Sequence, residues 1–179
     1  SRSDQKEATR ARLLEAARTV FEESGFEAAN LRRIAARAGV APGTIFVHFR
    51  DKRDLLHAAL FEDLRGALDA VLSGPDEGSL EAWLDRLAEA TLGYYARRPA
   101  LSRVLLRESL LAEAPWAERF AAQMAATHAA IAARAAREPG LRPDADLPLL
   151  ALSWLSFHHF ALVAWVQGAH PDPRGLIRR

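Results

Sequence analysis

The segment AGVAPGTIFVHF, Ala38 to Phe49, interrupts a chain that is otherwise rich in alanine, leucine, arginine and glutamate. Gly39 suits the left-handed conformation that often ends a helix. Pro42 has no backbone N–H, and in the first turn of a helix this loses no hydrogen bond. The segment therefore predicts a tight turn that begins at Gly39, followed by a short helix over residues 43–49.

The residues before this segment predict two further helices. A first helix runs from about Asp4 to Ser24 and ends at Gly25, and Asn30 caps a short second helix that ends at Gly39. Two short helices joined by a glycine-containing turn are typical of a helix-turn-helix.

The outward face of the third helix is the surface that this motif presents. Ile45 and Phe49, four residues apart, are predicted to face inward, because so short a helix must be anchored on its neighbours to persist in water. Thr44, Val47 and His48 are then predicted to face outward.

Charge around the motif suits a polyanionic partner. The whole chain holds 24 Lys and Arg against 23 Asp and Glu, so its net charge of +1 indicates nothing about partners. The interval from Ala28 to Arg50 nevertheless contains four arginines, among them Arg32 and Arg33, and no carboxylate. A local positive surface of this kind favours nucleic acid, and a solvated helix face is the alternative explanation.

The remainder of the chain is predicted to be helical as well. A fourth helix follows Asp51 and reaches Leu72, and the stretch Ser73–Gly78 is the clearest linker. Further helices are expected at about Leu80–Arg98, Ala100–Leu111, Pro115–Arg137 and Ala145–Val166, with a last one restarting near Gly175.

The segment IAARAGVAPGTIFVHFRDKRDLL, Ile34 to Leu56, resembles the DNA-binding domain of the TetR family of bacterial transcriptional regulators. This resemblance implies an all-α protein: an N-terminal three-helix helix-turn-helix DNA-binding domain over residues 1–53 and a C-terminal helical ligand-binding and dimerisation domain over residues 54–179. The implied function is that of a transcriptional regulator, a repressor that a small, largely apolar effector releases from double-stranded operator DNA.

The resemblance also implies which residues contact DNA. Thr44, His48 and Lys52 match positions that bind phosphates, and Arg32 matches a position that reaches bases. The full set of expected DNA contacts is Arg32, Arg33, Pro42, Gly43, Thr44, Phe46, Val47, His48 and Lys52.

Two apolar residues of this set are notable. Phe46 stands where the family usually has Tyr, so a hydroxyl that contacts the DNA backbone or a base is missing. Val47, on the outward face, is suited to contact a thymine methyl group.

Residues for an effector pocket are sought on the helices after the linker and on the last strong helix. Aromatic and apolar side chains with a few polar groups suit an apolar ligand of moderate size, and plain core packing is the alternative for each of them. The candidates are Trp83, Leu87, Tyr94, Leu105, Phe120, Met124, His128, Trp154 and Phe157.

The last strong helix, about Ala145–Val166, is apolar on nearly every side. A membrane span needs about 20 consecutive apolar residues, and this stretch barely reaches that length and contains two serines and two histidines. Burial between the core and a second subunit is the better explanation. We therefore expect a homodimer through the last helices and no membrane.

The sequence predicts no cofactor, no metal site and no enzyme active site. There is no cysteine, and His158 and His159 point about 100° apart on their helix, so they do not readily share one ion. Neither a nucleophile–base pair nor a phosphate-binding glycine loop is evident. A helical enzyme or carrier, and a helix-turn-helix protein that binds another protein through Phe46 and Val47, are the alternatives. With no secretion signal at the start of the sequence, a cytoplasmic location is expected.

Overall fold

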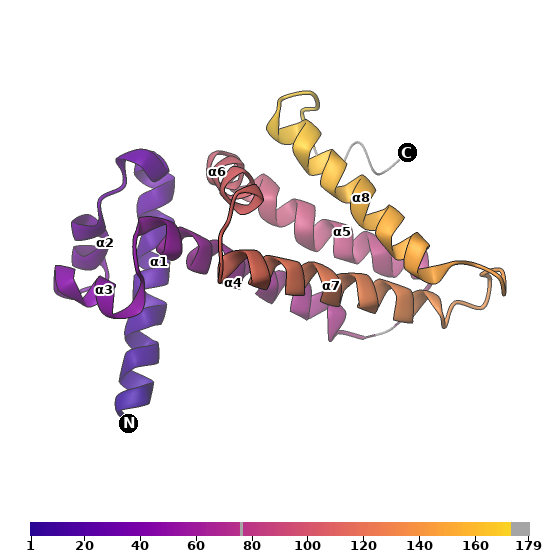
Figure 1. The fold of residues 1–179 in the computed structure, drawn as a ribbon, viewed down its shortest axis with the longest axis horizontal. Coiled ribbons are helices and arrows are strands. Elements are labelled where there is room, and N and C mark those ends of the chain that lie inside the picture. The colour runs from indigo at the N-terminus through magenta and orange to yellow at the C-terminus, as the bar shows by residue number, and fades with distance from the viewer. Residues whose placement is uncertain (76, 173–179) are drawn as a thin grey trace. The chain divides into compact units, whose positions relative to one another are not determined.

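The computed structural model describes residues 1–75 and 77–172, and this part of the chain contains eight α-helices, one 3₁₀-helix and no strand (Figure 1). The prediction of an all-α fold is confirmed. The elements are α1 (Arg2–Ala28), α2 (Leu31–Arg37), η1 (Pro42–Thr44), α3 (Ile45–His48), α4 (Lys52–Leu72), α5 (Leu80–Arg97), α6 (Pro99–Leu110), α7 (Trp116–Ala135) and α8 (Leu147–Val166). The helix expected near Gly175 lies outside the described residues.

The first helix continues beyond its predicted end through a kink. Gly25, with φ of 73° and ψ of 163°, adopts a conformation that glycine alone reaches readily, and one more helical turn follows it. The kink brings Phe26 onto Phe21, with ring centroids 5.6 Å apart. Asn30 caps α2 as predicted, because its side chain accepts a hydrogen bond of 2.8 Å from the backbone N–H of Arg32.

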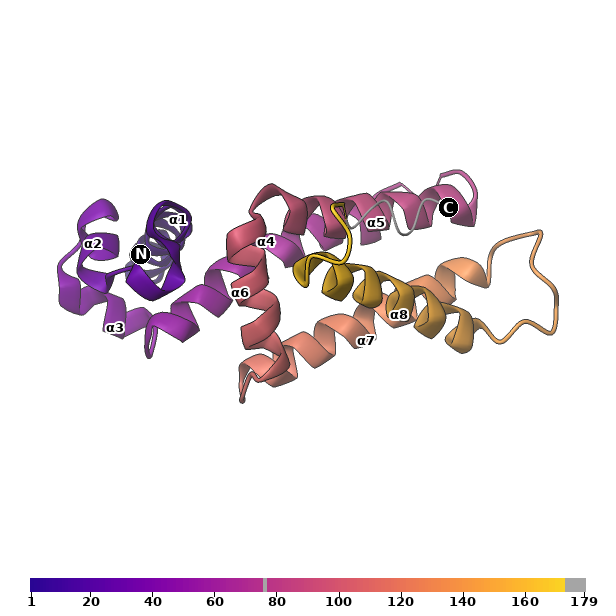
Figure 2. The same cartoon turned by 90° about the horizontal axis from the view of Figure 1, so that it is seen from above.

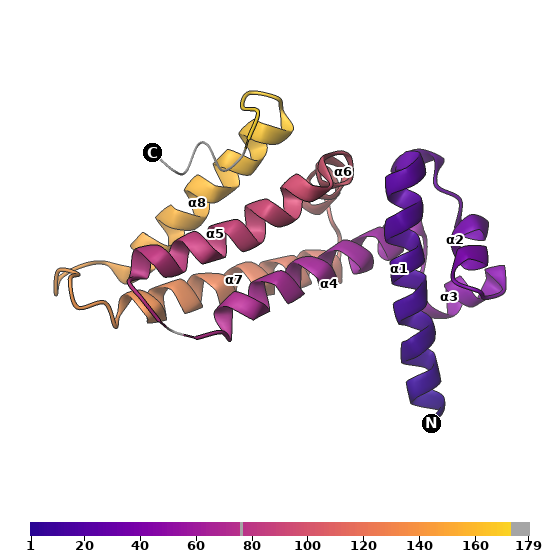
Figure 3. The ribbon, with the colours of Figure 1, turned by 180° about the vertical axis from the view of Figure 1, so that it is seen from behind.

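The third helix is shorter and tighter than predicted. It starts as the 3₁₀ turn η1 at Pro42 and becomes α-helical only over the four residues of α3. Gly39 has a φ of 67°, which confirms the tight turn predicted to begin at this residue. Figures 1 and 3 show α2 and α3 lying beside α1.

The chain divides into two compact units. Unit 1 comprises residues 1–63 and 100–111, and unit 2 comprises residues 64–99 and the described residues from 112 onward. The first half of α4 belongs to unit 1 because it packs on α1: the Arg18 guanidinium donates to the Ala59 carbonyl at 3.1 Å and pairs with Asp63 at 2.7 Å. The boundary predicted between residues 53 and 54 thus lies inside a helix, and the division into units follows residue 63.

The core of unit 1 holds the two short helices in place. Apolar residues of α1 are buried, and so are residues of α2, α3 and α4. Helices of seven and four residues do not persist alone in water, so this burial fixes their position. The buried residues are Leu13, Leu14, Ala17, Val20, Phe21, Ile34, Ala35, Ile45, Phe49, Leu55, Leu56 and Ala59.

Unit 2 is built from α5, α7, α8 and the end of α4, and α8 packs along α7 (Figure 2). The buried Arg134 near the end of α7 donates to the carboxylate of Glu138 at 3.0 Å and to the Gly78 carbonyl at 2.6 Å. The same carboxylate accepts from the backbone N–H of Leu80 at 2.9 Å. These contacts join the end of α7 to the start of α5.

α8 is the one described helix that is long and apolar enough to cross a membrane, with a mean hydropathy of 1.6. A single helix of this kind does not indicate a membrane protein, because a helix packed on several sides in a folded domain has the same length and composition.

Candidate DNA interface

The short helix α3 presents one exposed face, as its sequence predicts. Ile45 and Phe49 are buried, whereas Phe46 is 62% exposed and Val47 is 67% exposed. Thr44 and His48 are half-buried beside them. The buried pair anchors the helix, so that its other side chains are offered to a partner at fixed positions.

Three arginines of α2 differ in what they contact. Arg33 and Arg37 both pair with the carboxylate of Glu23 on α1, Arg37 at 3.3 Å. Arg32 is exposed, and within the described part of the chain its guanidinium has no hydrogen-bond or ion-pair partner. The charge that the sequence places on α2 is therefore partly offset by Glu23, and Arg32 is the arginine of this helix free to bind a ligand.

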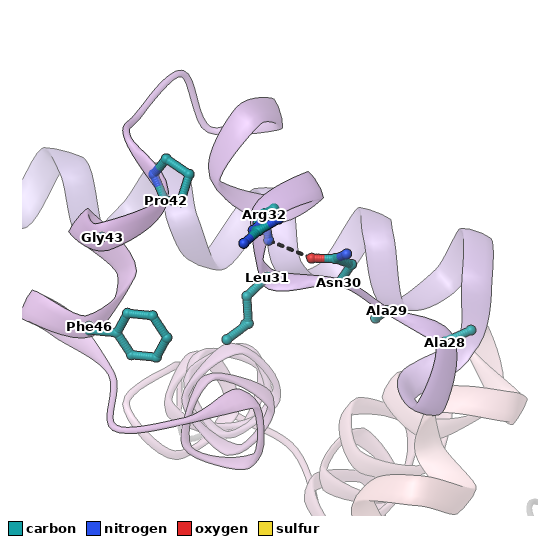
Figure 4. A pocket seen from close by; sticks show the side chains of 8 residues that line it. All are labelled: Ala28, Ala29, Asn30, Leu31, Arg32, Pro42, Gly43 and Phe46. Atoms are coloured by element: carbon teal, nitrogen blue, oxygen red, sulfur yellow. Dashed lines mark hydrogen bonds between the residues drawn. The ribbon is translucent and has the colours of Figure 1, made fainter.

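An apolar groove of about 660 Å³ lies between the end of α1, the start of α2 and the segment from η1 to α3 (Figure 4). Leu31 and Phe46 point toward one another across it, and Arg32 lies at its rim. Its lining is Ala28, Ala29, Asn30, Leu31, Arg32, Pro42, Gly43 and Phe46.

A second, polar cleft of about 340 Å³ lies on the other side of α3, against the first turns of α1. Its lining is Ser3, Lys6, Glu7, Arg10, Val47 and His48. Arg10 is held in place by an ion pair with Glu62 at 2.5 Å and lies over the ring of Phe49. Ser3 and Lys6 were not predicted from the sequence, because they precede α3 by about 40 residues; their helical spacing with Arg10 was the available signal.

His48 is suited to act as a neutral hydrogen-bond donor in this cleft. Partial burial, followed by the charges of Lys6 and Arg10, lowers the pKa of its imidazole. Its Nδ1 is buried without a partner among the described residues. A neutral ring with an unprotonated Nδ1 carries its proton on Nε2, which is the donor that a phosphate oxygen needs.

Lys52 has a structural role that the sequence did not reveal. Its ammonium donates to the carbonyls of Phe26, Glu27 and Ala29 at 2.8, 2.9 and 3.3 Å, and it lies 4.7 Å from the centre of the Phe26 ring. A cation at the end of a helix also interacts favourably with the helix dipole. The phosphate contact expected of Lys52 stays a prediction, and the three N–H donors already have acceptors within the protein.

The end of α6 is tied to the same unit by ion pairs. Glu108 accepts from Arg53 at the start of α4 at 3.1 Å, and Arg107 lies 3.6 Å from Glu27 at the end of α1. His57, four residues after Arg53 on α4, is buried, and this burial lowers the pKa of its imidazole. Helix α6 therefore contacts both helices that frame the motif, although its neighbours along the chain, α5 and α7, belong to unit 2.

The residues predicted to line an effector pocket fall into three environments. Trp83, Leu87 and Tyr94 of α5 are buried in unit 2, and Leu105 of α6 is buried in unit 1. The half-buried candidates are Phe120, His128 and Trp154, and the exposed ones are Met124 and Phe157. The pocket itself stays a prediction.

Met124 and His128 line an apolar groove of about 750 Å³ between α7 and α8. Its floor and walls are Met124, Ala125, His128, Leu152, Leu155, Ser156, His159, Phe160 and Val163. Phe157 and Phe160 of α8 are 70% and 65% exposed. This helix pair therefore presents a large apolar surface of the kind that marks a protein interface.

His158 is the buried polar group of α8. Its ring stacks on Trp154 with centroids 3.5 Å apart, and its Nδ1 lies 3.1 Å from the Trp154 carbonyl. Burial lowers the pKa of the imidazole to about 4, so the ring is neutral at pH 7. Its Nε2 is buried without a partner among the described residues.

Comparison with known proteins places the helix-turn-helix of unit 1 among bacterial regulatory proteins. Residues 13–59 match the model of the bacterial regulatory proteins of the tetR family. The chain is 36% identical over 105 residues to the HTH-type transcriptional repressor SCO4008 of Streptomyces coelicolor, covering 58% of this chain and 51% of that protein. It is 36% identical over 125 residues to the HTH-type transcriptional repressor Rv1474c of Mycobacterium tuberculosis, covering 69% of this chain and 65% of that protein.

The fold extends the likeness beyond the aligned sequence. A TetR transcription regulator from Haloarcula marismortui superposes with a TM-score of 0.73 over 97% of this chain and 91% of that chain, at 23% identity. The matched motif carries the exposed face of α3, and the shared fold covers both units. Residues 13–59 therefore carry the DNA-binding domain of the tetR family of bacterial regulatory proteins, and the chain shares the fold of a TetR transcription regulator.

Proposed function

We propose that this protein is a ligand-responsive transcriptional repressor, located in the cytoplasm, that binds operator DNA through unit 1. The observation that carries the proposal is the exposed face of α3, which buried Ile45 and Phe49 anchor. It lies between Arg32, which has no partner among the described residues, and a polar cleft. Such a face meets the two requirements of DNA recognition, donors for phosphates and a surface for base edges.

The phosphate contacts come from two sides of α3. Thr44 and the Nε2 of His48 supply neutral donors, and Lys6 and Arg10 supply charge in the cleft beside His48. Lys6 takes the place that sequence reasoning gave to Lys52, because the Lys52 ammonium already serves three carbonyls. Phosphate neutralisation by such groups supplies most non-specific affinity for DNA.

Two copies of the chain bind one operator. The apolar groove and the exposed Phe157 and Phe160 on the α7–α8 face are the surface through which we propose that the copies associate. An isologous contact of this kind has two-fold symmetry. In the DNA-bound dimer the two α3 helices then lie about 34–36 Å apart, which matches successive major grooves.

The effector is a small, largely apolar molecule bound by unit 2. The buried Nε2 of His158, an acceptor with no donor among the described residues, is the atom to which a ligand hydroxyl or N–H would donate. Binding reaches the DNA face through α6, whose Arg107 and Glu108 hold α1 and α4. The effector stabilises a dimer whose α3 spacing does not match the grooves, and the population of the DNA-binding form falls.

Selection of DNA from random 30-base-pair duplexes tests the proposal. The full chain is expected to enrich one motif with two inverted half-sites, and His48→Ala, whose residue is only half-buried, is expected to lose that enrichment while keeping the wild-type unfolding temperature. If neither protein enriches a motif, the DNA-binding proposal is overturned.

A further inference from the structure

We propose that Phe46 reads thymine through its 5-methyl group, so that each operator half-site places a thymine methyl in the apolar groove beside this ring. The inference rests on the proposed function and specifies the class of base that unit 1 selects. It also assigns the contact to Phe46 and not to its equally exposed neighbour Val47.

The chemistry of the groove leaves few other ways to recognise a base. Its walls are the side chains of Ala28, Ala29, Leu31 and Pro42 together with the ring of Phe46. A Cβ atom at Gly43 would have no described atom within 4 Å apart from those of the adjacent residues, so the groove is open at this position. The 5-methyl group of thymine is the one apolar group that a base pair of unmodified DNA presents in the major groove, and an apolar concavity favours it over a hydrogen-bonding edge.

Asn30 and Arg32 are the polar side chains that line the groove. The Oδ1 of Asn30 already accepts from the backbone N–H of Arg32 (Figure 4), and the Arg32 guanidinium has no acceptor in the described part of the chain. A cationic donor next to an apolar surface fits a duplex, which offers phosphate and guanine acceptors within a few ångströms of a thymine methyl. A purely apolar peptide would leave this guanidinium without a partner.

The two exposed apolar residues of α3 face different surroundings. Phe46 lines the apolar groove, whereas Val47 lines the polar cleft with Lys6 and His48. The cleft is where the proposed phosphate contacts lie, so a thymine methyl is expected at Phe46. Because Phe46 and Val47 are exposed to similar extents, replacing either one leaves the core of unit 1 unchanged.

The test uses the selected operator with single thymines replaced by deoxyuridine, a change that removes only the methyl group. Affinity is measured by fluorescence anisotropy with the full chain and with Phe46→Ala, Phe46→Tyr and Val47→Ala. One replacement in a half-site is expected to weaken wild-type binding about four-fold, the factor that corresponds to about 0.8 kcal/mol for a buried CH₂. The same replacement is expected to leave the affinity of Phe46→Ala unchanged, and Phe46→Tyr and Val47→Ala keep the four-fold effect.

Each other result separates this inference from the proposed function. Tight, selective binding in which every thymine tolerates deoxyuridine overturns the methyl contact and leaves the DNA-binding proposal intact. An equal loss in wild type and in Phe46→Ala, or a loss that disappears only in Val47→Ala, overturns the assignment to Phe46. Absence of any selective binding overturns the proposed function and this inference together.

Discussion

Replacing Lys52 by Met separates a structural role for this lysine from a role in DNA binding. Met keeps the length of the aliphatic stem and removes the ammonium that donates to three carbonyls at the end of α1. The site is half-buried and the carbonyls regain water, so each lost hydrogen bond counts for about 0.5–1 kcal/mol, below the range for fully buried charged donors. The lost contact with the Phe26 ring adds about 0.5–1 kcal/mol.

The free energy of unfolding is therefore expected to fall by about 2–4 kcal/mol, which lowers the unfolding temperature by roughly 4–16 °C. Urea unfolding followed by circular dichroism measures the first quantity and a thermal scan the second. Lys6→Met is the matched control, since Lys6 is exposed at the start of the same unit and is expected to change stability by less than about 0.5 kcal/mol. Wild-type stability in Lys52→Met, combined with weaker DNA binding, would refute the reasoning and restore Lys52 as a phosphate contact.

Four other changes test separate parts of the structure. Lys6→Met is expected to reduce the slope of log affinity against log salt by about 1.8, from two phosphate contacts per dimer at about 0.9 each, and an unchanged slope would remove Lys6 from the interface. Gly25→Ala should lower the free energy of unfolding by about 1–3 kcal/mol through backbone strain alone, since the added Cβ has no described atom within 4 Å apart from those of the adjacent residues. A chemical denaturation curve that matches wild type would exclude that strain. Phe160→Asp should turn a dimer into a folded monomer in sedimentation velocity, and a persistent dimer would place the interface elsewhere. Burial lowers the pKa of His158 from 6.5 to about 4, so the free energy of unfolding should fall by about 3 kcal/mol as the pH drops from about 6.5 towards 4. In urea unfolding at a series of pH values, His158→Gln should show a smaller fall. An equal dependence on pH in the two proteins would contradict the burial of a neutral ring.

Local sequence signals predicted the motif of unit 1 well. Gly25, Asn30 and Gly39 act where short-range backbone chemistry decides the outcome, and the structure confirms a left-handed conformation at both glycines and the cap at Asn30. The four-residue spacing of Ile45 and Phe49 likewise fixed which side of α3 is buried.

Contacts between residues far apart in the chain could not be predicted in this way. The partners of Lys52 precede it by 23 to 26 residues, and nothing in the local pattern distinguishes a lysine that binds carbonyls from one that binds phosphate. Glu23 lies outside the interval without carboxylates and yet pairs with Arg33 and Arg37.

The membership of α6 in unit 1 is a further feature that depends on tertiary packing. Its amphipathic spacing predicts a helix and an inward face but not the unit on which that face packs. Arg107 and Glu108 supply the charges that bind α1 and α4, and the helices before and after α6 along the chain belong to unit 2.

The most direct test of the central claim is the salt dependence of DNA binding by the exposed face of α3. Fluorescence anisotropy of the selected operator, titrated with the full chain at 50 and 200 mM salt and repeated with His48→Ala, measures it. We expect tight binding that weakens by several orders of magnitude at the higher salt, and a clear loss of affinity in His48→Ala with the fold intact. Binding that is indifferent to salt and equal in the two proteins would contradict the assignment of this face to DNA.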